Sequence, residues 1–419
     1  MTASDPFVVY AGRVVTCDPA RMAGENPLGA ITDAGMLVEG GVVRKVAPRA
    51  EMAGAAGGAA VLLDAPESVI TPGLCDAHTH AVFVGSRHDE YVRRMAGASY
   101  DDIAQAGGGI VASMRAVRAA TSSELGRALV ERLSRMAALG VTTVEVKSGY
   151  GLDAANEEKQ LDAIALARQS PLLPRVVPTY LALHALPPEA VGNRVGYVAD
   201  AAARTRAFGR ARLIEFVDAY VDANAFTTAE ALLVADAARE SGVGIRLHAG
   251  QFSDVGAAAL AARIGAASAD HLEHVSRRDL DALAIAGTRA VLLPIASFTL
   301  GQRPPPIADM RSAGVRMVVA SDANPGTAPT ESLPLALAFA VRSYGLTPDE
   351  ALLGATREAA HALRLGERVG TLAPGFAADF AVWDLPHEHA IVQPWGTSKT
   401  RLVVRAGEIL APAVSTPSV

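Results

Sequence analysis

The pattern of apolar and polar positions changes near residue 70 of this 419-residue chain. Before that point, short apolar or alternating runs at 7–16, 35–46 and 59–65 are separated by Gly, Pro and Asp, which is typical of strands and turns. This part predicts a small β-sheet unit. After it, eight apolar runs typical of strands alternate with longer Ala-rich stretches; they lie at 73–80, 140–148, 175–185, 212–222, 243–250, 266–275, 289–297 and 315–322.

The stretches between these runs have the spacing of helices. The clearest ones lie at 122–139, 157–169, 229–241, 254–264 and 277–286. Strands that alternate with helices favour a parallel sheet, and eight such units in roughly 250 residues predict a closed (β/α)8 TIM barrel.

Strand character returns near the C-terminus. A further helix is predicted at 348–365, and apolar runs at 369–384 and 400–410 again resemble strands. The simplest arrangement places them beside the N-terminal strands. We therefore predict an α/β protein with the barrel at 72–361 and one small β-sandwich built from 1–71 and 362–419.

Charge and composition narrow the class of partner. The formal net charge is −6 and no Lys/Arg cluster occurs, which argues against nucleic acid or an anionic membrane and favours a small-molecule ligand. The two cysteines, Cys17 and Cys75, fit a reducing compartment better than a disulfide framework. Because no apolar run approaches about 18 residues, we expect a cytoplasmic protein.

Candidate metal ligands occur at the ends of the predicted strands. His78 and His80 lie two apart, so on a strand both imidazoles would point to one side. His248, His271 and Asp322 close three other strands, at the barrel face where catalytic groups gather. Any one of these alone is more often a structural hydrogen-bonding group. Five such residues at the C-terminal ends of predicted strands predict a binding site for zinc or iron. One coordination position would be left for a water molecule that the metal acidifies, and His271 or Asp322 would handle the proton.

Several longer segments carry a resemblance to a known family. These are "PGLCDAHTHAVFVGSR", "AGASYDDIAQAGGGI", "VEVKSGYGL", "SADHLEHVS" and "SDANPGT". Together they resemble the amidohydrolase superfamily and, within it, the imidazolonepropionase family of histidine degradation. The resemblance covers nearly the whole chain and implies a metal-dependent barrel that opens the ring of 4-imidazolone-5-propanoate to give N-formimidoyl-L-glutamate. A homodimer is compatible with it.

The resemblance also implies roles for individual residues. One metal ion per subunit, zinc or iron, would be held by His78, His80, His248 and Asp322. Arg87 and Tyr150 would bind the propanoate, and His184 the ring. Asn324, Gly326 and Thr327 would offer amide donors from an exposed turn. The run Gly107 to Gly109 resembles a hinge or lid before a helix, and His274 is expected to be structural.

Three positions set limits on this resemblance. Lys147 lies on the second barrel strand rather than the fourth, so a single metal is predicted and Lys147 is assigned a structural or electrostatic role. Gln251 stands where the family can carry a glutamate, and because glutamine is no base it could only orient substrate or water. Ala323 replaces an expected cysteine.

Two other functions remain open from the sequence. A deaminase of a purine or pyrimidine would use the same metal ligands without needing Arg87 and Tyr150. A catalytically inactive scaffold of the same fold is the second alternative, although such a protein would tend to lose metal ligands.

Overall fold

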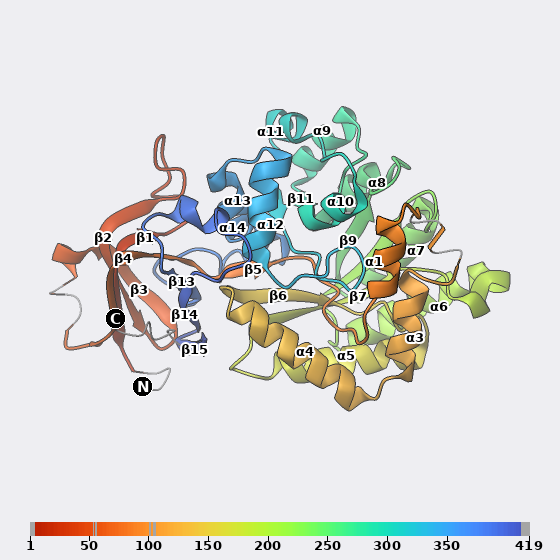
Figure 1. Ribbon diagram of the computed structural model, residues 1–419, viewed down its shortest axis with the longest axis horizontal. Helices are drawn as coiled ribbons and strands as arrows, with labels where there is room; N and C mark the ends of the chain where they lie inside the picture. Colours follow the sequence, from red (N-terminus) through yellow and green to blue (C-terminus); the bar gives the residue numbers. More distant parts are fainter. Residues whose placement is uncertain (1–4, 53, 55–56, 100–101, 104–105, 412–419) are drawn as a thin grey trace.

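A computed structural model describes residues 5–52, 54, 57–99, 102–103 and 106–411. Seven strands form the small unit on the left of Figure 1, where both ends of the chain meet. Their order is β15-β14-β13-β4-β1-β2-β3. The bounds are β1 Phe7–Val15, β2 Ala30–Glu39, β3 Val42–Pro48, β4 Ala60–Pro72, β13 Phe380–Trp383, β14 Thr400–Arg405 and β15 Glu408–Ala411. The predicted union of the two chain ends is confirmed.

The small sheet is one hydrogen-bonded sheet that curls around its own core. Only β1 and β4 pair in parallel; the remaining neighbours are antiparallel. A bridge between Val42 and Ala377 brings β3 back to the segment that precedes β13. Phe7 and Met36 from one end of the chain pack with Phe380 and Val404 from the other. The two halves of the sheet therefore face each other across this shared apolar layer.

Eight parallel strands form the barrel, as predicted. Their bounds are β5 Leu74–Asp76, β6 Val141–Lys147, β7 Arg175–Leu183, β8 Phe216–Val221, β9 Gly244–Ala249, β10 Ser268–His271, β11 Arg289–Leu292 and β12 Met317–Val319. The strands are hydrogen-bonded in chain order from β5 to β12.

Contacts beyond the strand ends close the barrel between β12 and β5. The amide of Asp322 donates to His78 O (3.0 Å), and the amide of His80 donates to Ala323 O (3.0 Å). At the residue before Asp322, the Ser321 amide and hydroxyl both donate to the Asp76 carboxylate, at 3.0 and 2.5 Å. These bonds hold the His78–His80 segment directly against the segment that carries Asp322.

Helices cover the outside of the barrel. Their bounds are α1 His88–Met95, α3 Ile110–Ala119, α4 Ser122–Ala137, α5 Ala154–Arg168, α6 Arg194–Arg210, α7 Thr228–Glu240, α8 Ala257–Ile264, α9 Arg277–Ala286, α10 Pro294–Leu300, α11 Ile307–Ala313, α12 Leu333–Phe339, α13 Pro348–Gly354 and α14 Arg357–Ala362. Short 3-10 turns lie at Arg49–Glu51, Pro188–Asn193 and Glu388–Val392, with a π-helical turn at Ala340–Tyr344.

Sequence-encoded capping fixes the start of several helices. Thr121 with Glu124, Thr227 with Glu230, and Thr347 with Glu350 form reciprocal capping boxes at α4, α7 and α13. Within the described ranges, no helix has both the length and the apolar character needed to cross a membrane.

Three local predictions were wrong. The run 289–297 is a strand only to Leu292, because Pro294 starts α10. The predicted helix 348–365 is two helices, since Thr356 is non-helical (φ −126°, ψ −98°) between α13 and α14. The His78–His80 pair lies just beyond β5, which ends at Asp76. Its residue Thr79 nevertheless forms a parallel bridge with Ala323, so the segment continues the barrel wall.

Candidate metal centre

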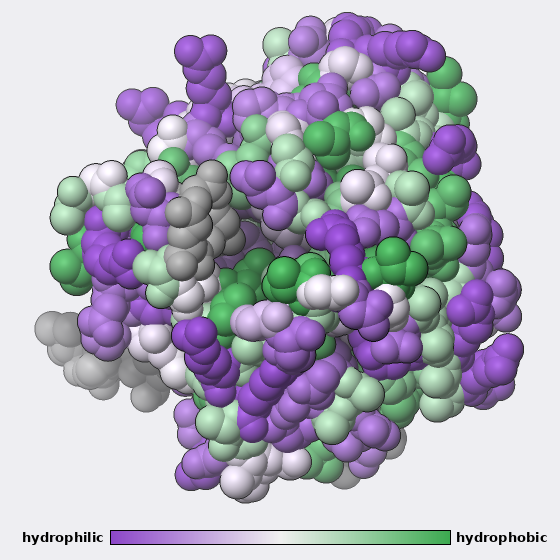
Figure 2. Space-filling view, turned by 90° about the vertical axis from the view of Figure 1, so that its right-hand side faces the viewer, coloured by the Kyte–Doolittle hydropathy of each residue, from purple (hydrophilic) through white to green (hydrophobic). Residues whose placement is uncertain are grey.

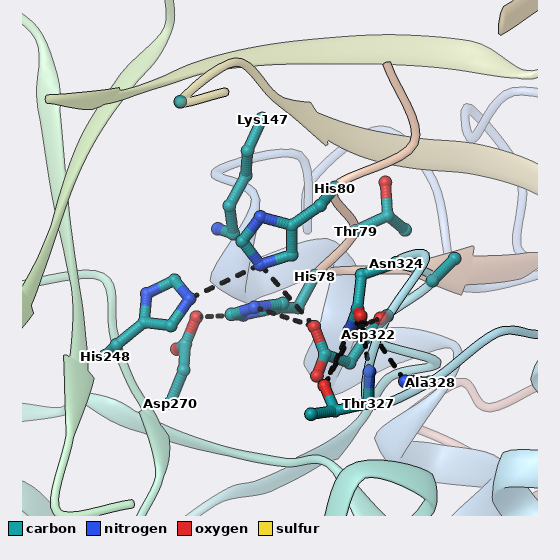
Figure 3. A network of polar contacts seen from close by, with 12 residues as sticks. His78, Thr79, His80, Lys147, His248, Asp270, Asp322, Asn324, Thr327 and Ala328 are labelled. Atoms are coloured by element: carbon teal, nitrogen blue, oxygen red, sulfur yellow. Dashed lines mark hydrogen bonds and ion pairs between the residues drawn. The ribbon is translucent and has the colours of Figure 1, made fainter. Parts of the chain in front are cut away.

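Three imidazoles and one carboxylate converge at the C-terminal end of the barrel (Figure 3). The ring nitrogens His78 Nε2 and His80 Nε2 each lie 3.5 Å from Asp322 Oδ1. The Nε2 atoms of His80 and His248 are also 3.5 Å apart. The four side chains come from segments far apart in the sequence, after β5 and β12 and at the end of β9.

The spacing of these atoms fits a metal ion. Ligand atoms about 2.0–2.1 Å from a tetrahedral zinc ion lie roughly 3.4 Å from one another, close to the separations found here. Within the described chain, His78 Nε2 is buried and has no hydrogen-bond partner. A buried nitrogen of this kind normally has one. Two overlapping groups meet the requirements for holding an ion: His78, His80 and Asp322, and His78, His248 and His271.

The protonation of the histidines suits metal binding. Burial, reinforced by the Lys147 ammonium, holds the pKa of His78 well below its usual value. Burial and the neighbouring His184 do the same for the pKa of His80. Both imidazoles are therefore neutral near pH 7, which is the form that coordinates a metal. Burial raises the pKa of Asp322 to about 6, although the His271 and His248 charges oppose this rise.

Two of the imidazoles contact buried carboxylates through Nδ1, and each carboxylate also pairs with a buried cation. His78 Nδ1 lies 2.6 Å from Asp270 Oδ2, and the same oxygen is 3.2 Å from Arg246. His248 Nδ1 lies 3.0 Å from Asp218 Oδ2, which is 2.9 Å from Lys147 Nζ. A carboxylate on the far nitrogen fixes the tautomer and turns Nε2 toward a metal.

Lys147 belongs to a buried network of ion pairs behind the candidate site. Its ammonium lies between Asp218 and Glu145 (2.6 Å) and is fully buried. Burial alone would raise the pKa of Asp218, but His248 and Lys147 outweigh it and hold that pKa well below the usual range. Sequence reasoning missed Asp218 and Asp270, although Asp270 directly precedes His271 in the quoted "SADHLEHVS".

His271 lies beside a different carboxylate, that of Glu273. Its Nδ1 lies 3.7 Å from Glu273 Oε2, and Glu273 also accepts a hydrogen bond from the Ser297 hydroxyl. Burial lowers the pKa of His271, but Glu273 outweighs it, so the net shift is upward. Unlike His78 and His80, this histidine is therefore suited to carrying a proton.

The backbone is strained at two candidate residues. His271 (φ 81°) and Asp322 (φ 54°) occupy the left-handed region that non-glycine residues rarely adopt. Such conformations cluster at functional sites, where the surrounding structure enforces them. The hydrogen bond from the Asp322 amide to His78 O is one such constraint.

A metal-side cavity of about 50 Å³ brings most of the predicted residues together. Its lining includes His80, Arg87, Tyr150, His184, His248, Gln251, His271, Asp322, Asn324 and Thr327, with Ile110 and Tyr220 added by the structure. No sequence signal pointed to Tyr220, whose ring centroid lies 5.6 Å from that of His248.

Three of the residues predicted to bind substrate have defined neighbours. Arg87 donates to Glu90 Oε2 from Nε (2.8 Å) and from an amino nitrogen (2.6 Å). His184 Nδ1 lies 2.8 Å from Gly149 O, so its Nε2 is left for the cavity, and its ring stacks on that of His80 at 5.1 Å. Tyr150 packs against the His184 ring at the same centroid distance, 5.1 Å.

The loop after Asp322 differs from the prediction. The amides of Gly326 and Thr327 both donate to Asn324 Oδ1 (2.8 Å each), so they are used within the loop. The expectation of free amide donors on an exposed turn was therefore wrong. Gly326 instead makes room: a Cβ there would lie 2.2 Å from an amino nitrogen of Arg87.

The remaining predicted features lie around this site. Gly109 directly precedes α3, as expected, and its amide donates to Glu90 Oε1 (3.0 Å). His274 is exposed in the loop after β10. Ala323 is buried beside Asp322. Of the segment 96–110, residues 100–101 and 104–105 lie outside the described residues.

Comparisons with known proteins agree with this geometry. Residues 69–410 match the model of the amidohydrolase family. The chain is 44% identical to the imidazolonepropionase of Mesorhizobium japonicum over 88% of its length, covering 90% of that protein. It is 46% identical to the imidazolonepropionase of Caulobacter vibrioides over 86% of its length, covering 91% of that protein.

Solved structures share the fold. A triazine hydrolase variant superposes with a TM-score of 0.77 at 16% identity, over 97% of this chain and 95% of that one. An adenosine deaminase from Xanthomonas campestris with bound zinc gives a TM-score of 0.70 at 17% identity, over 99% of this chain and 95% of that one. At these identities the likeness shows the fold alone.

Proposed function

The chain belongs to the amidohydrolase family and, within it, to the imidazolonepropionases, and on this basis we propose that its site hydrolyses 4-imidazolone-5-propanoate to N-formimidoyl-L-glutamate. Water adds to the ring carbonyl carbon and the ring C–N bond breaks. The carbonyl carbon becomes a carboxylate and the nitrogen stays on the formimidoyl group. The observation that carries the proposal is the convergence of His78, His80, His248 and Asp322 at metal-ligand spacing.

These four residues hold one metal ion per subunit. The chemistry that such an ion supplies is acidification of a water molecule and polarisation of the ring carbonyl. Zinc and iron both suit this set of imidazole and carboxylate ligands.

His271 and Asp322 handle the proton. His271 faces the ligand group, and Glu273 raises its pKa, so it can take a proton and deliver it to the departing ring nitrogen. Asp322, whose pKa is raised to about 6, is the second acceptor. Gln251 lines the cavity but cannot accept a proton, so it orients substrate or water.

The substrate is held on the other side of the cavity. Arg87 and Tyr150 bind the propanoate, because a guanidinium and a hydroxyl are good donors to a carboxylate. His184 contacts the ring through Nε2, the nitrogen that its bond to Gly149 leaves available. Asn324 and Thr327 contribute side-chain groups, while Gly326 leaves room for the Arg87 guanidinium.

Two broader expectations remain proposals. We infer a cytoplasmic enzyme, in line with the cysteine usage, and a homodimer, in line with the family. Sedimentation of the purified protein would measure the oligomeric state directly.

The test is loss of imidazolone absorbance when purified protein meets freshly generated 4-imidazolone-5-propanoate. The assay is run with and without chelator, and the metal content of the same sample is determined. Chelator-sensitive loss with formation of N-formimidoyl-L-glutamate is the expected result. Absence of turnover by a metal-replete sample would contradict the proposal and direct attention to nucleobase deamination.

A further inference from the structure

A second and larger cavity adjoins the metal-side cavity; we call it the outer chamber. It measures about 490 Å³, against about 50 Å³ for the metal-side cavity. Ile110, His184 and Tyr220 line both, so the two spaces meet at these residues. Figure 2 shows a hollow in this face of the molecule with apolar side chains on its walls.

The walls of the two cavities differ in chemistry. Donor and acceptor side chains surround the metal-side cavity, among them Arg87, His271 and Asp322. The outer chamber is lined mainly by apolar and aromatic groups. They come from the start of α3 and from the segments that follow β7, β8 and β9: Ile110, Val111, Leu186, Ala225, Phe226 and Phe252, with the Tyr220 ring at the junction.

The charge in the outer chamber is neutralised. Arg194 is the one charged side chain among the described residues of its lining. Its Nε and one amino nitrogen donate to the two carboxylate oxygens of Glu230, at 2.6 and 2.8 Å. The guanidinium also lies 4.8 Å from the centre of the Phe226 ring. An uncharged aromatic group in this chamber would contact the rings of Tyr220, Phe226 and Phe252.

From this pairing of cavities we propose that the site also hydrolyses cyclic amides whose ring carries an uncharged aryl arm, with the arm held in the outer chamber. The inference rests on the proposed function, because the ring chemistry is the same. Water adds to the ring carbonyl carbon, the ring C–N bond breaks, and a carboxylate and a formimidoyl group result. Only the group that anchors the arm changes, from Arg87 to the apolar walls.

A matched pair of substrates tests the proposal. 4-Imidazolone-5-propanoate and 5-(2-phenylethyl)-4-imidazolone have the same two-carbon arm, which ends in a carboxylate in one and a phenyl ring in the other. We expect hydrolysis of both, the second to N-formimidoyl-homophenylalanine. The Leu186→Ser variant should lower kcat/KM for the phenylethyl compound by about tenfold and for the propanoate by less than about threefold, because it removes apolar contact from the chamber only.

A control variant and the product analysis separate the outcomes. Leu172→Ser removes an exposed leucine outside both linings and should leave both substrates unaffected. Hydrolysis of the propanoate without hydrolysis of the phenylethyl compound would overturn this inference and leave the proposed function intact. Equal loss of both activities in Leu186→Ser would also overturn it, since the chamber would then be only a common route to the metal side. Failure of both substrates with metal-replete protein would overturn the proposed function as well.

Discussion

The fully buried Lys147 shows how single side chains set the chemistry of this site. Its ammonium pairs with both Asp218 and Glu145, and Asp218 in turn contacts Nδ1 of His248. Arg246 and Asp270 repeat the arrangement behind His78. The two cations therefore contact carboxylates, and the carboxylates contact the proposed metal ligands His78 and His248.

Lys147→Met should destabilise the protein by about 3–5 kcal/mol, because it removes the buried ammonium that lies nearest to the carboxylates of Asp218 and Glu145. The free energy of unfolding, measured with denaturant, checks this. Lys45→Met is the control, since Lys45 is only partly buried and bonds the backbone of Glu51; it should change stability by less than about 0.5 kcal/mol. An unchanged midpoint for Lys147→Met would show that the network does not need its charge.

Arg87→Ala should raise KM for 4-imidazolone-5-propanoate by about 10–100-fold, which is the loss expected for a charge-assisted bond to a carboxylate. Metal content should be unchanged, because Arg87 is not among the residues that could hold the ion. Arg93→Ala serves as the control, because Arg93 is exposed on helix α1, which directly follows Arg87. Retention of full activity by Arg87→Ala would remove the support for propanoate binding at this residue and favour a neutral base as substrate.

Closure of the barrel between β12 and β5 determines where the proposed metal ligands meet. The amide and hydroxyl of Ser321 donate to the Asp76 carboxylate across the gap between β12 and β5. The amide of the next residue, Asp322, donates to His78 O across the same gap. We call this row of bonds the seam. The seam thus joins the two chain segments that supply three of the four proposed metal ligands.

Ser321→Ala should cost about 1–3 kcal/mol, because the buried Asp76 carboxylate loses its hydroxyl donor. Urea unfolding measures the change. Ser134→Ala removes an exposed hydroxyl on α4 and should be nearly neutral. Equal stability of the two variants would mean that the backbone bonds alone hold the seam.

Over the complete chain, burial of histidines makes stability depend on pH. Burial lowers the pKa of His184 to about 3, whereas a histidine in the unfolded chain titrates near about 6.5. Between these values the unfolded state binds the extra proton. The contribution of His184 is therefore fully present above about pH 6.5 and is lost as the pH falls toward 3. The raised pKa values of Asp76, to about 7, and Asp322, to about 6, act in the opposite sense.

His184→Gln isolates the histidine contribution. The unfolding free energy of the parent should fall more steeply with acidification than that of the variant, by up to about 1.4 kcal/mol per pH unit between pH 6.5 and 3. Denaturant titrations at a series of pH values give both slopes. Parallel curves would contradict the lowered pKa.

Metal loading should stabilise the folded chain as well as activate it. An ion that binds only the native state at 100 times its dissociation constant adds about 2.7 kcal/mol. We expect the melting temperature to rise on adding zinc or iron to chelated protein, and the rise to disappear in His248→Asn. A metal-independent melting temperature would contradict the assigned ligand set.

The order of strands and helices follows from local patterns, so much of the architecture could be predicted without coordinates. Alternation of apolar runs with helical stretches predicted all eight barrel strands, and the returning strand patterns predicted the union of the chain ends. Predictions failed where a single residue overrides the average pattern, as Pro294 and Thr356 do. The domain limits and the roles of the site residues remain predictions.

Spacing and residue type pointed to His78, His80, His248, His271 and Asp322, because each lies at or shortly after the C-terminal end of a barrel strand. The partners of these residues depend on contacts between distant segments: Asp218 behind His248, Asp270 behind His78, Glu273 beside His271. The folded structure also determines that the Gly326 amide bonds the Asn324 side chain, and that the outer chamber lies beside the metal-side cavity. The periodicity of the sequence indicates the direction in which a side chain points, but only packing in three dimensions determines which groups it contacts.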